Sequence, residues 1–103
     1  MSRSSTTTDL LPIPAPGETL LEDVLQPLGL SQNALARSLR IDPRRINEIV
    51  LGKRAITADT DLRLSRYLGT SPGFWLRLQA DYDLRVQQRQ LRAELRKITP
   101  RAA

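Results

Sequence analysis

The sequence predicts an all-α fold, a single compact domain of five helices. Hydrophobic residues make up 40% of the 103 residues but only four residues are aromatic, so the core must consist mainly of Leu, Ile, Val and Ala. From residue 19 onward apolar residues recur at spacings of three and four, the period of a helix with one buried face. No segment alternates apolar and polar residues as a strand does, and the length suits one domain.

The first sixteen residues are predicted to form a flexible leader. Residues 1–9 are rich in Ser and Thr, and residues 12–17 hold three prolines and a glycine, which favours an extended entry into the fold. Folding is expected to begin near Gly17. The first helix carries its apolar stripe from Thr19, has acidic residues early, where the helix dipole favours them, and ends near residues 27–29.

A second and a third short helix follow. Ser31 is suited to cap the second helix, and Asp42 followed by Pro43 gives the start signal of the third. Gly52 is the residue best able to end the third helix in a left-handed conformation. The expected buried residues are Leu35, Ala36 and Leu39 in the second helix, and Ile46, Ile49 and Val50 in the third.

The last two predicted helices differ in length. Thr57 caps the fourth helix and Gly69 closes it. The fifth opens at Ser71–Pro72, and no residue breaks it from Phe74 to Ile98, although its apolar spacing loosens after Tyr82. The apolar residues of the fourth helix are Leu62, Leu64, Tyr67 and Leu68.

The positive charge of the chain, +5 overall, is concentrated in two segments. Residues 85–103 carry six basic side chains and one acidic one, so residues 86–103 are predicted to be a basic extension of the last helix beyond a domain of residues 17–85. Residues 37–54 carry six basic side chains against two acidic ones. The second cluster is the more informative, because contact with phosphates depends on where the charge lies.

Residues 31–51 match the spacing of a helix-turn-helix. Such a motif needs apolar residues at set points and a small residue where its two helices cross, which is Ala36. Arg40 occupies the turn position that often holds glycine, and positive φ there costs a residue with a side chain roughly 1–2 kcal/mol. Counted from Gln32, the apolar points are Leu35, Ala36, Leu39, Ile41, Ile46 and Ile49.

The outer face of the third helix is predicted to read DNA. An arginine can donate two hydrogen bonds to guanine and an asparagine can pair with adenine, so Arg44 and Asn47 are the candidate base contacts. Arg45 could read a base or hold a phosphate. Glu48 would repel phosphate and is expected to pair with Arg44 four residues earlier. The candidate contacts to the DNA backbone are Ser31, Gln32 and Asn33 before and in the second helix, and Lys53 and Arg54 after the third.

Composition also excludes several function classes. The chain has no cysteine and no histidine, which removes disulfides, thiolate nucleophiles, imidazole bases and the usual zinc ligands. We therefore expect no enzyme, no metal site and no cofactor. The N-terminus lacks the apolar run of a secretory signal and no stretch is long enough to span a membrane, so a cytoplasmic location is expected.

From Pro16 to Arg85 the sequence resembles the HigA-type antitoxins of bacterial addiction modules, within the XRE-like helix-turn-helix group. The most specific matching segments are RRINEIVLGKRAIT and GTSPGFWLRLQADYDL. Family members often have His-Pro-Gly where this chain has Ala15-Pro16-Gly17. The leader and the basic tail lie outside the resemblance.

The resemblance implies a compact five-helix, repressor-like domain with a C-terminal dimerisation helix. It also implies a homodimer that binds an operator palindrome in its own promoter and that binds and neutralises an mRNA-cleaving toxin. By position, DNA recognition falls on Arg44, Arg45 and Asn47, with Gln32 and Lys53 at the backbone. The dimer role falls on the C-terminal helix, at Phe74, Trp75, Leu78 and Tyr82.

Several alternatives stay open. Phe74, Trp75 and Tyr82 could form plain core packing instead of a dimer interface, or could do both. The protein could be a stand-alone XRE-type repressor without a toxin, which a neighbouring toxin gene would argue against. A small basic ribonuclease is disfavoured, because the chain has no strand pattern. A pure interaction module would keep its activity without Arg44 and Arg45.

Overall fold

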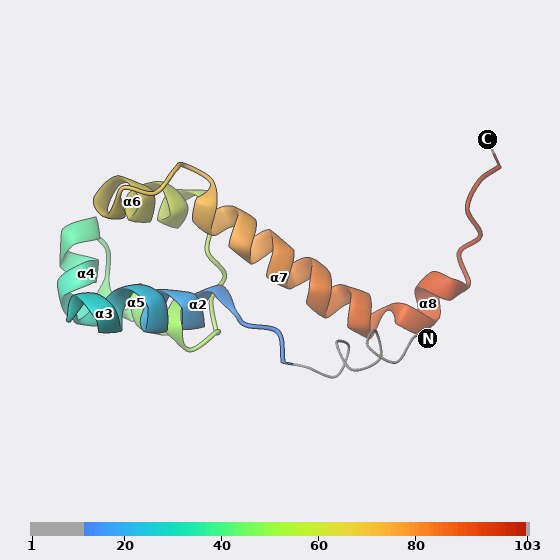
Figure 1. Cartoon of the computed structure of the whole chain (residues 1–103), viewed down its shortest axis with the longest axis horizontal. Helices are drawn as coiled ribbons and strands as arrows, with labels where there is room; N and C mark the ends of the chain where they lie inside the picture. The colour runs from blue at the N-terminus through green and yellow to red at the C-terminus, as the bar shows by residue number, and fades with distance from the viewer. Residues whose placement is uncertain (1–11, 103) are drawn as a thin grey trace.

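The computed structural model describes residues 12–102, and every regular element within them is a helix, which confirms the all-α prediction (Figure 1). The first helix is continuous through α2 (Pro16–Thr19), the π-helical segment η1 (Leu20–Leu25) and α3 (Gln26–Leu28). Its wide middle turn precedes Pro27, which lacks the N–H that an α-helix would bond to the residue four positions earlier. The N–H of Gln26 instead bonds to the carbonyl of Leu21, five positions back.

The predicted leader overlaps the start of this helix by one residue. Pro16, which the sequence places in the leader, is the first residue of α2 and is buried. Its fixed φ suits the first helical position, where an N–H has no partner to bond. Residues 12–15 have no regular structure, and the rest of the predicted leader, residues 1–11, lies outside the described residues.

Three capped helices follow, as the sequence predicts: α4 (Gln32–Leu39), α5 (Pro43–Val50) and α6 (Ala58–Leu68). The hydroxyl of Ser31 accepts a hydrogen bond from the N–H of Ala34, at 3.0 Å. The Asp42 carboxylate accepts one from the N–H of Arg44, at 2.8 Å. Gly52 and Gly69 take the left-handed conformation expected of them, with φ of 76° and 80°. These local signals therefore place the helix boundaries correctly.

The last helix is shorter than predicted. The sequence predicts a helix that runs unbroken to Ile98, but α7 (Phe74–Gln90) ends at Leu91, whose φ of −96° and ψ of 5° leave the helical region, and α8 (Arg92–Arg96) follows. Residues 12–102 thus contain six helices instead of five. The break contains neither glycine nor proline, so residue type does not explain it. Figure 1 shows α7 leading away from the other helices, with α8 at its far end. No helix in residues 12–102 is both long and apolar enough to cross a membrane.

The core lies where the first helix, α4, α5, α6 and the start of α7 meet. On α6 the predicted apolar face is only partly correct: Leu64 is buried and Leu68 packs against the core, but Leu62 and Tyr67 are 56% and 47% exposed. Polar residues take their place on the inner face of α6, where Thr60 and Asp61 are almost fully buried beside Leu64. The buried hydrophobic residues are Leu20, Leu25, Leu35, Ala36, Leu39, Ile46, Ile49, Ile56, Leu64 and Trp75.

Candidate nucleic-acid interface

The packing of α4 on α5 forms the predicted helix-turn-helix. Ala36 is fully buried where the two helices meet, so its small side chain permits their close approach. Arg40 has a φ of 62°, which confirms the predicted left-handed turn. The N–H of Ile41 reaches back to the carbonyl of Ala36 at 3.0 Å and so closes the end of α4. The turn therefore keeps its geometry without glycine.

Arg44, predicted to read a base, is highly accessible. Its side chain is 82% exposed near the start of α5, and its Nε lies 3.5 Å from the Glu48 carboxylate. The predicted pairing of these two side chains is confirmed. Because Arg44 is so exposed and its contact with Glu48 is the one ion pair it makes within residues 12–102, its guanidinium can turn toward a ligand.

Glu48 is also held by a second arginine that follows the recognition helix. Arg54 folds back onto α5, and its Nε donates to Glu48 Oε1 at 2.8 Å. This hydrogen bond from Arg54, with the charge of Arg44 as a smaller cause, holds the pKa of the Glu48 carboxyl below its usual range. The negative charge that would repel phosphate is thus balanced by two arginines of the protein, and Arg54, predicted to contact phosphate, is partly engaged.

The amide side chains of Asn47 and Gln32 meet between the two helices of the motif. Asn47 Nδ2 donates to Gln32 Oε1 at 3.1 Å, which joins α5 to the first residue of α4. The sequence predicts both as DNA contacts, and the structure brings the two together, while Arg44, three residues before Asn47, lies on the same side of α5 by helix spacing. Asn33 is exposed beside them, while the hydroxyl of Ser31 is used as the helix cap. Lys53 lies exposed in the turn after α5.

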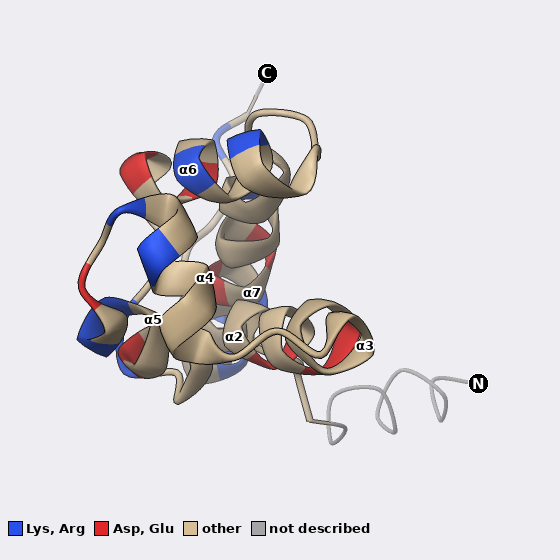
Figure 2. Cartoon of the chain, turned by 90° about the vertical axis from the view of Figure 1, so that its left-hand side faces the viewer, with Lys and Arg blue, Asp and Glu red and all other residues tan. Residues whose placement is uncertain are grey.

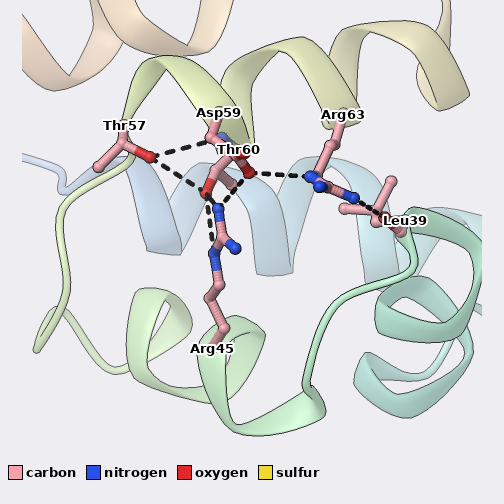
Figure 3. A network of polar contacts seen from close by, with 6 residues as sticks. All are labelled: Leu39, Arg45, Thr57, Asp59, Thr60 and Arg63. Carbon is pink, nitrogen blue, oxygen red and sulfur yellow. Dashed lines mark hydrogen bonds and ion pairs between the residues drawn. The ribbon is translucent and has the colours of Figure 1, made fainter.

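Arg45 points in a different direction from Arg44. Its guanidinium is turned toward α6, where Nε and Nη2 donate to the Thr60 hydroxyl at 3.2 and 2.8 Å and Nη2 also donates to Asp59 (Figure 3). Only 25% of the side chain is exposed. A contact between Arg45 and DNA, as the sequence predicts, would require this network to open.

The recognition helix and the first helix differ in the charge that they carry. Figure 2 shows Lys and Arg on α5 at one edge of the molecule, and Asp and Glu on the helix that ends with α3 at another. The first helix carries Glu18, Glu22 and Asp23 and has no basic residue. A DNA duplex would therefore be attracted to the edge that holds α5.

The residues predicted for dimerisation do not all have the same environment. Trp75 is 1% exposed and belongs to the core of the protomer. Phe74 is 39% exposed, and its ring meets that of Trp75 edge to face at 5.2 Å. Leu78 and Tyr82 are half-buried on the same helix. The core alternative thus describes Trp75, and the remaining three keep accessible surface for a partner.

Two buried polar residues that organise the site's scaffold were not found by sequence reasoning. Asp61, 2% exposed, accepts the N–H groups of Gly73, Trp75 and Leu76 at 2.7, 2.8 and 3.1 Å and so caps α7 from α6. Gln79 accepts the N–H of Ile56 at 2.8 Å, which fixes the loop after α5. The absence of an Ncap side chain at Gly73 is a signal that α7 needs a cap from elsewhere.

Comparisons with known proteins agree with this geometry. A family model described as helix-turn-helix matches residues 21–75, more than half of the chain. Virulence-associated protein I of Dichelobacter nodosus is 51% identical over 78 residues, which cover 76% of this chain and 72% of that protein.

Solved structures extend the similarity over most of the chain. An addiction module antidote protein of the HigA family from Coxiella burnetii is similar with a TM-score of 0.82 at 39% identity, covering 88% of this chain and 100% of that one. Antitoxin HigA of Pseudomonas aeruginosa, solved with the higBA promoter, has a TM-score of 0.83 at 36% identity and covers 89% and 100%. The chain therefore belongs to the helix-turn-helix family and, within it, to the HigA family of non-enzymatic antitoxins.

Proposed function

We propose that this protein binds a palindromic operator in its own promoter as a homodimer and neutralises a cognate mRNA-cleaving toxin. The observation that carries the DNA-binding part is the exposed Arg44 guanidinium beside the joined amides of Asn47 and Gln32. These groups lie near the start of a helix that a major groove can admit. The HigA of Pseudomonas aeruginosa, similar over most of both chains, was solved with its promoter, which supports the same role here. Operator DNA as ligand also implies a cytoplasmic location.

In this proposal the contacts divide into two kinds. Arg44 and Asn47 read base edges, while Gln32, Lys53 and the exposed N-terminal end of α4, with Ser31 and Asn33, hold the phosphate backbone. Arg54 reaches phosphate when it releases Glu48. Base contacts discriminate between sequences, whereas phosphate contacts add affinity for any duplex.

A dimer is needed because two recognition helices must lie about 34 Å apart to read the halves of a palindrome. We assign the contact to the exposed parts of Phe74, Leu78 and Tyr82 on α7, with Trp75 packed behind them in the core. This arrangement would leave α5 of each protomer free to enter DNA.

Arg44→Ala should weaken operator binding by about 1–3 kcal/mol and relax the preference at one base position, because a bidentate guanine contact is lost. Lys53→Ala should weaken binding to operator and scrambled DNA alike and flatten the salt dependence, because it removes a phosphate contact. Fluorescence anisotropy at several salt concentrations measures both effects. Arg66→Ala, an exposed arginine on α6, is the control for loss of one charge. Equal losses on the two DNAs for Arg44→Ala would contradict base reading.

The toxin part of the proposal is tested by co-expression. The protein encoded by the neighbouring reading frame should arrest growth when induced alone, and this chain should restore growth when induced with it. Arg44→Ala should restore growth as well as the wild type does, since α5 reads DNA in this proposal. If the neighbouring protein is harmless, or if growth stays arrested, the protein is a stand-alone repressor instead.

A further inference from the structure

The two consecutive arginines of the recognition helix, Arg44 and Arg45, have different environments. Arg44 is exposed, whereas the Arg45 guanidinium makes three contacts with the first turn of α6 through Thr60 and Asp59. Thr60 is itself 1% exposed, so its hydroxyl is a fixed acceptor. Arg45 is thus held away from the surface that Arg44 occupies, although it is the next residue in the sequence.

Asp59 is the negative charge that holds this arrangement. Its Oδ1 accepts from Arg45 Nη2 and, at 2.8 Å, from Nε of Arg63 (Figure 3). Arg63 in turn donates through Nη1 to the carbonyl of Leu39 at the end of α4, at 2.8 Å. The hydrogen bonds from Arg45 first, and from Arg63 second, hold the pKa of the Asp59 carboxyl below its usual range, so its charge persists to a lower pH than that of an ordinary aspartate.

We propose that Asp59 is a positioning residue for sequence-specific DNA binding, because it keeps the Arg45 guanidinium off the duplex. This inference rests on the proposed operator binding. An arginine free to turn on the recognition helix would find a phosphate on any DNA and would add the same affinity to every sequence. By holding Arg45 against α6, Asp59 leaves Arg44 and Asn47 as the groups that distinguish one sequence from another.

The size of the effect follows from counterion release. One additional phosphate contact changes the slope of log K against log salt by about −0.9 and raises the affinity for any duplex roughly fivefold to tenfold at 0.1 M salt. Without the Asp59 charge, Arg45 should add this contact on scrambled DNA. On the operator, this Arg45–phosphate contact competes with the placement of Arg44 and Asn47 against the bases. The ratio of operator to scrambled affinity should therefore fall by about tenfold.

The test compares Asp59→Asn with Asp81→Asn, which removes the same charge from an exposed pair with Arg85 on α7. Asp59→Asn should bind scrambled DNA more tightly, with a slope steeper by about one, and its ratio of operator to scrambled affinity should be about tenfold lower than that of the wild type. Asp81→Asn should match the wild type in both quantities. Asp59→Ser, with a different side chain but the same loss of charge, should repeat the Asp59→Asn result. Circular dichroism of each variant establishes that the helices are intact.

Removing Arg45 distinguishes this proposal from the alternative, in which Arg45 of the wild type already contacts DNA. Arg45→Gln alone should leave the salt slope unchanged, and Asp59→Asn with Arg45→Gln should return the slope on scrambled DNA to the wild-type value. The proposal is overturned if Arg45→Gln alone flattens the slope by about one, which means that Arg45 already binds phosphate. It is also overturned if Asp59→Asn leaves the slope unchanged. A wild type without operator preference would instead refute the proposed function, a different failure.

Discussion

Gly17→Ala should destabilise the protein by about 3 kcal/mol or more, because the first helix crosses α5 with almost no space between the backbones. A Cβ at residue 17 would lie 1.9 Å from the carbonyl oxygen of Ile49 and 3.0 Å from Cα of Val50. Neither atom belongs to a flexible side chain, so α2 and α5 would have to separate. Helix propensity alone predicts the opposite sign, since alanine in a helix is favoured over glycine by about 1 kcal/mol.

Thermal unfolding followed by circular dichroism measures this effect. For a chain of this size we expect the midpoint to fall by about 12 °C or more. Gly29→Ala is the matched control. Gly29 has a φ of 61°, but a Cβ added there would meet nothing within 4 Å, so only backbone strain of about 1 kcal/mol is added. A Gly17→Ala variant as stable as the wild type would mean that the two helices do not approach as described.

Asp61→Ala should cost about 3 kcal/mol of stability, because one carboxylate serves as the cap of α7. Its removal leaves the N–H groups of Gly73, Trp75 and Leu76 without their acceptor, and Asp61 is only 2% exposed. Charge-assisted bonds from a helix N-terminus to a carboxylate are among the stronger ones in proteins. The start of α7, which includes the core residue Trp75, should therefore loosen.

Urea unfolding monitored by the fluorescence of Trp75, the single tryptophan, reports on the same region. Asp61→Asn should be intermediate, because its amide keeps one acceptor oxygen but places an NH₂ group against a donor. Asp81→Ala removes an exposed aspartate on α7, 62% exposed, and should change stability by less than about 0.5 kcal/mol. If Asp61→Ala and Asp81→Ala unfold at the same urea concentration, α7 does not depend on the cap.

Features encoded by nearby residues could be predicted from the sequence. Ser31, Asp42 and Thr57 each bond to an N–H two or three residues ahead, so their identity was enough to place the starts of α4, α5 and α6. The crossing at Ala36 and the left-handed Arg40 follow from spacing within one motif. The same locality explains why the Arg44–Glu48 pair could be predicted.

Features that depend on packing between distant segments could not be predicted in this way. Arg45 looks like a solvent-facing neighbour of Arg44 until α6 brings Asp59 and Thr60 beside it. Asp61 looks like an ordinary acid in the first turn of a helix, yet its partners lie twelve to fifteen residues ahead. The apolar character of Leu62 predicts a buried position, but the inner face of α6 is occupied by Thr60, Asp61 and Leu64, and Leu62 lies on the exposed side.

Whether this protein reads a specific operator is decided by titrating it at fixed salt against its own upstream promoter and a scrambled duplex of equal length. We expect a preference of about a thousandfold or more for the promoter, saturating at two protomers for each palindrome. Equal and weak binding to both duplexes would contradict operator recognition, and would make a protein partner the main ligand of this fold.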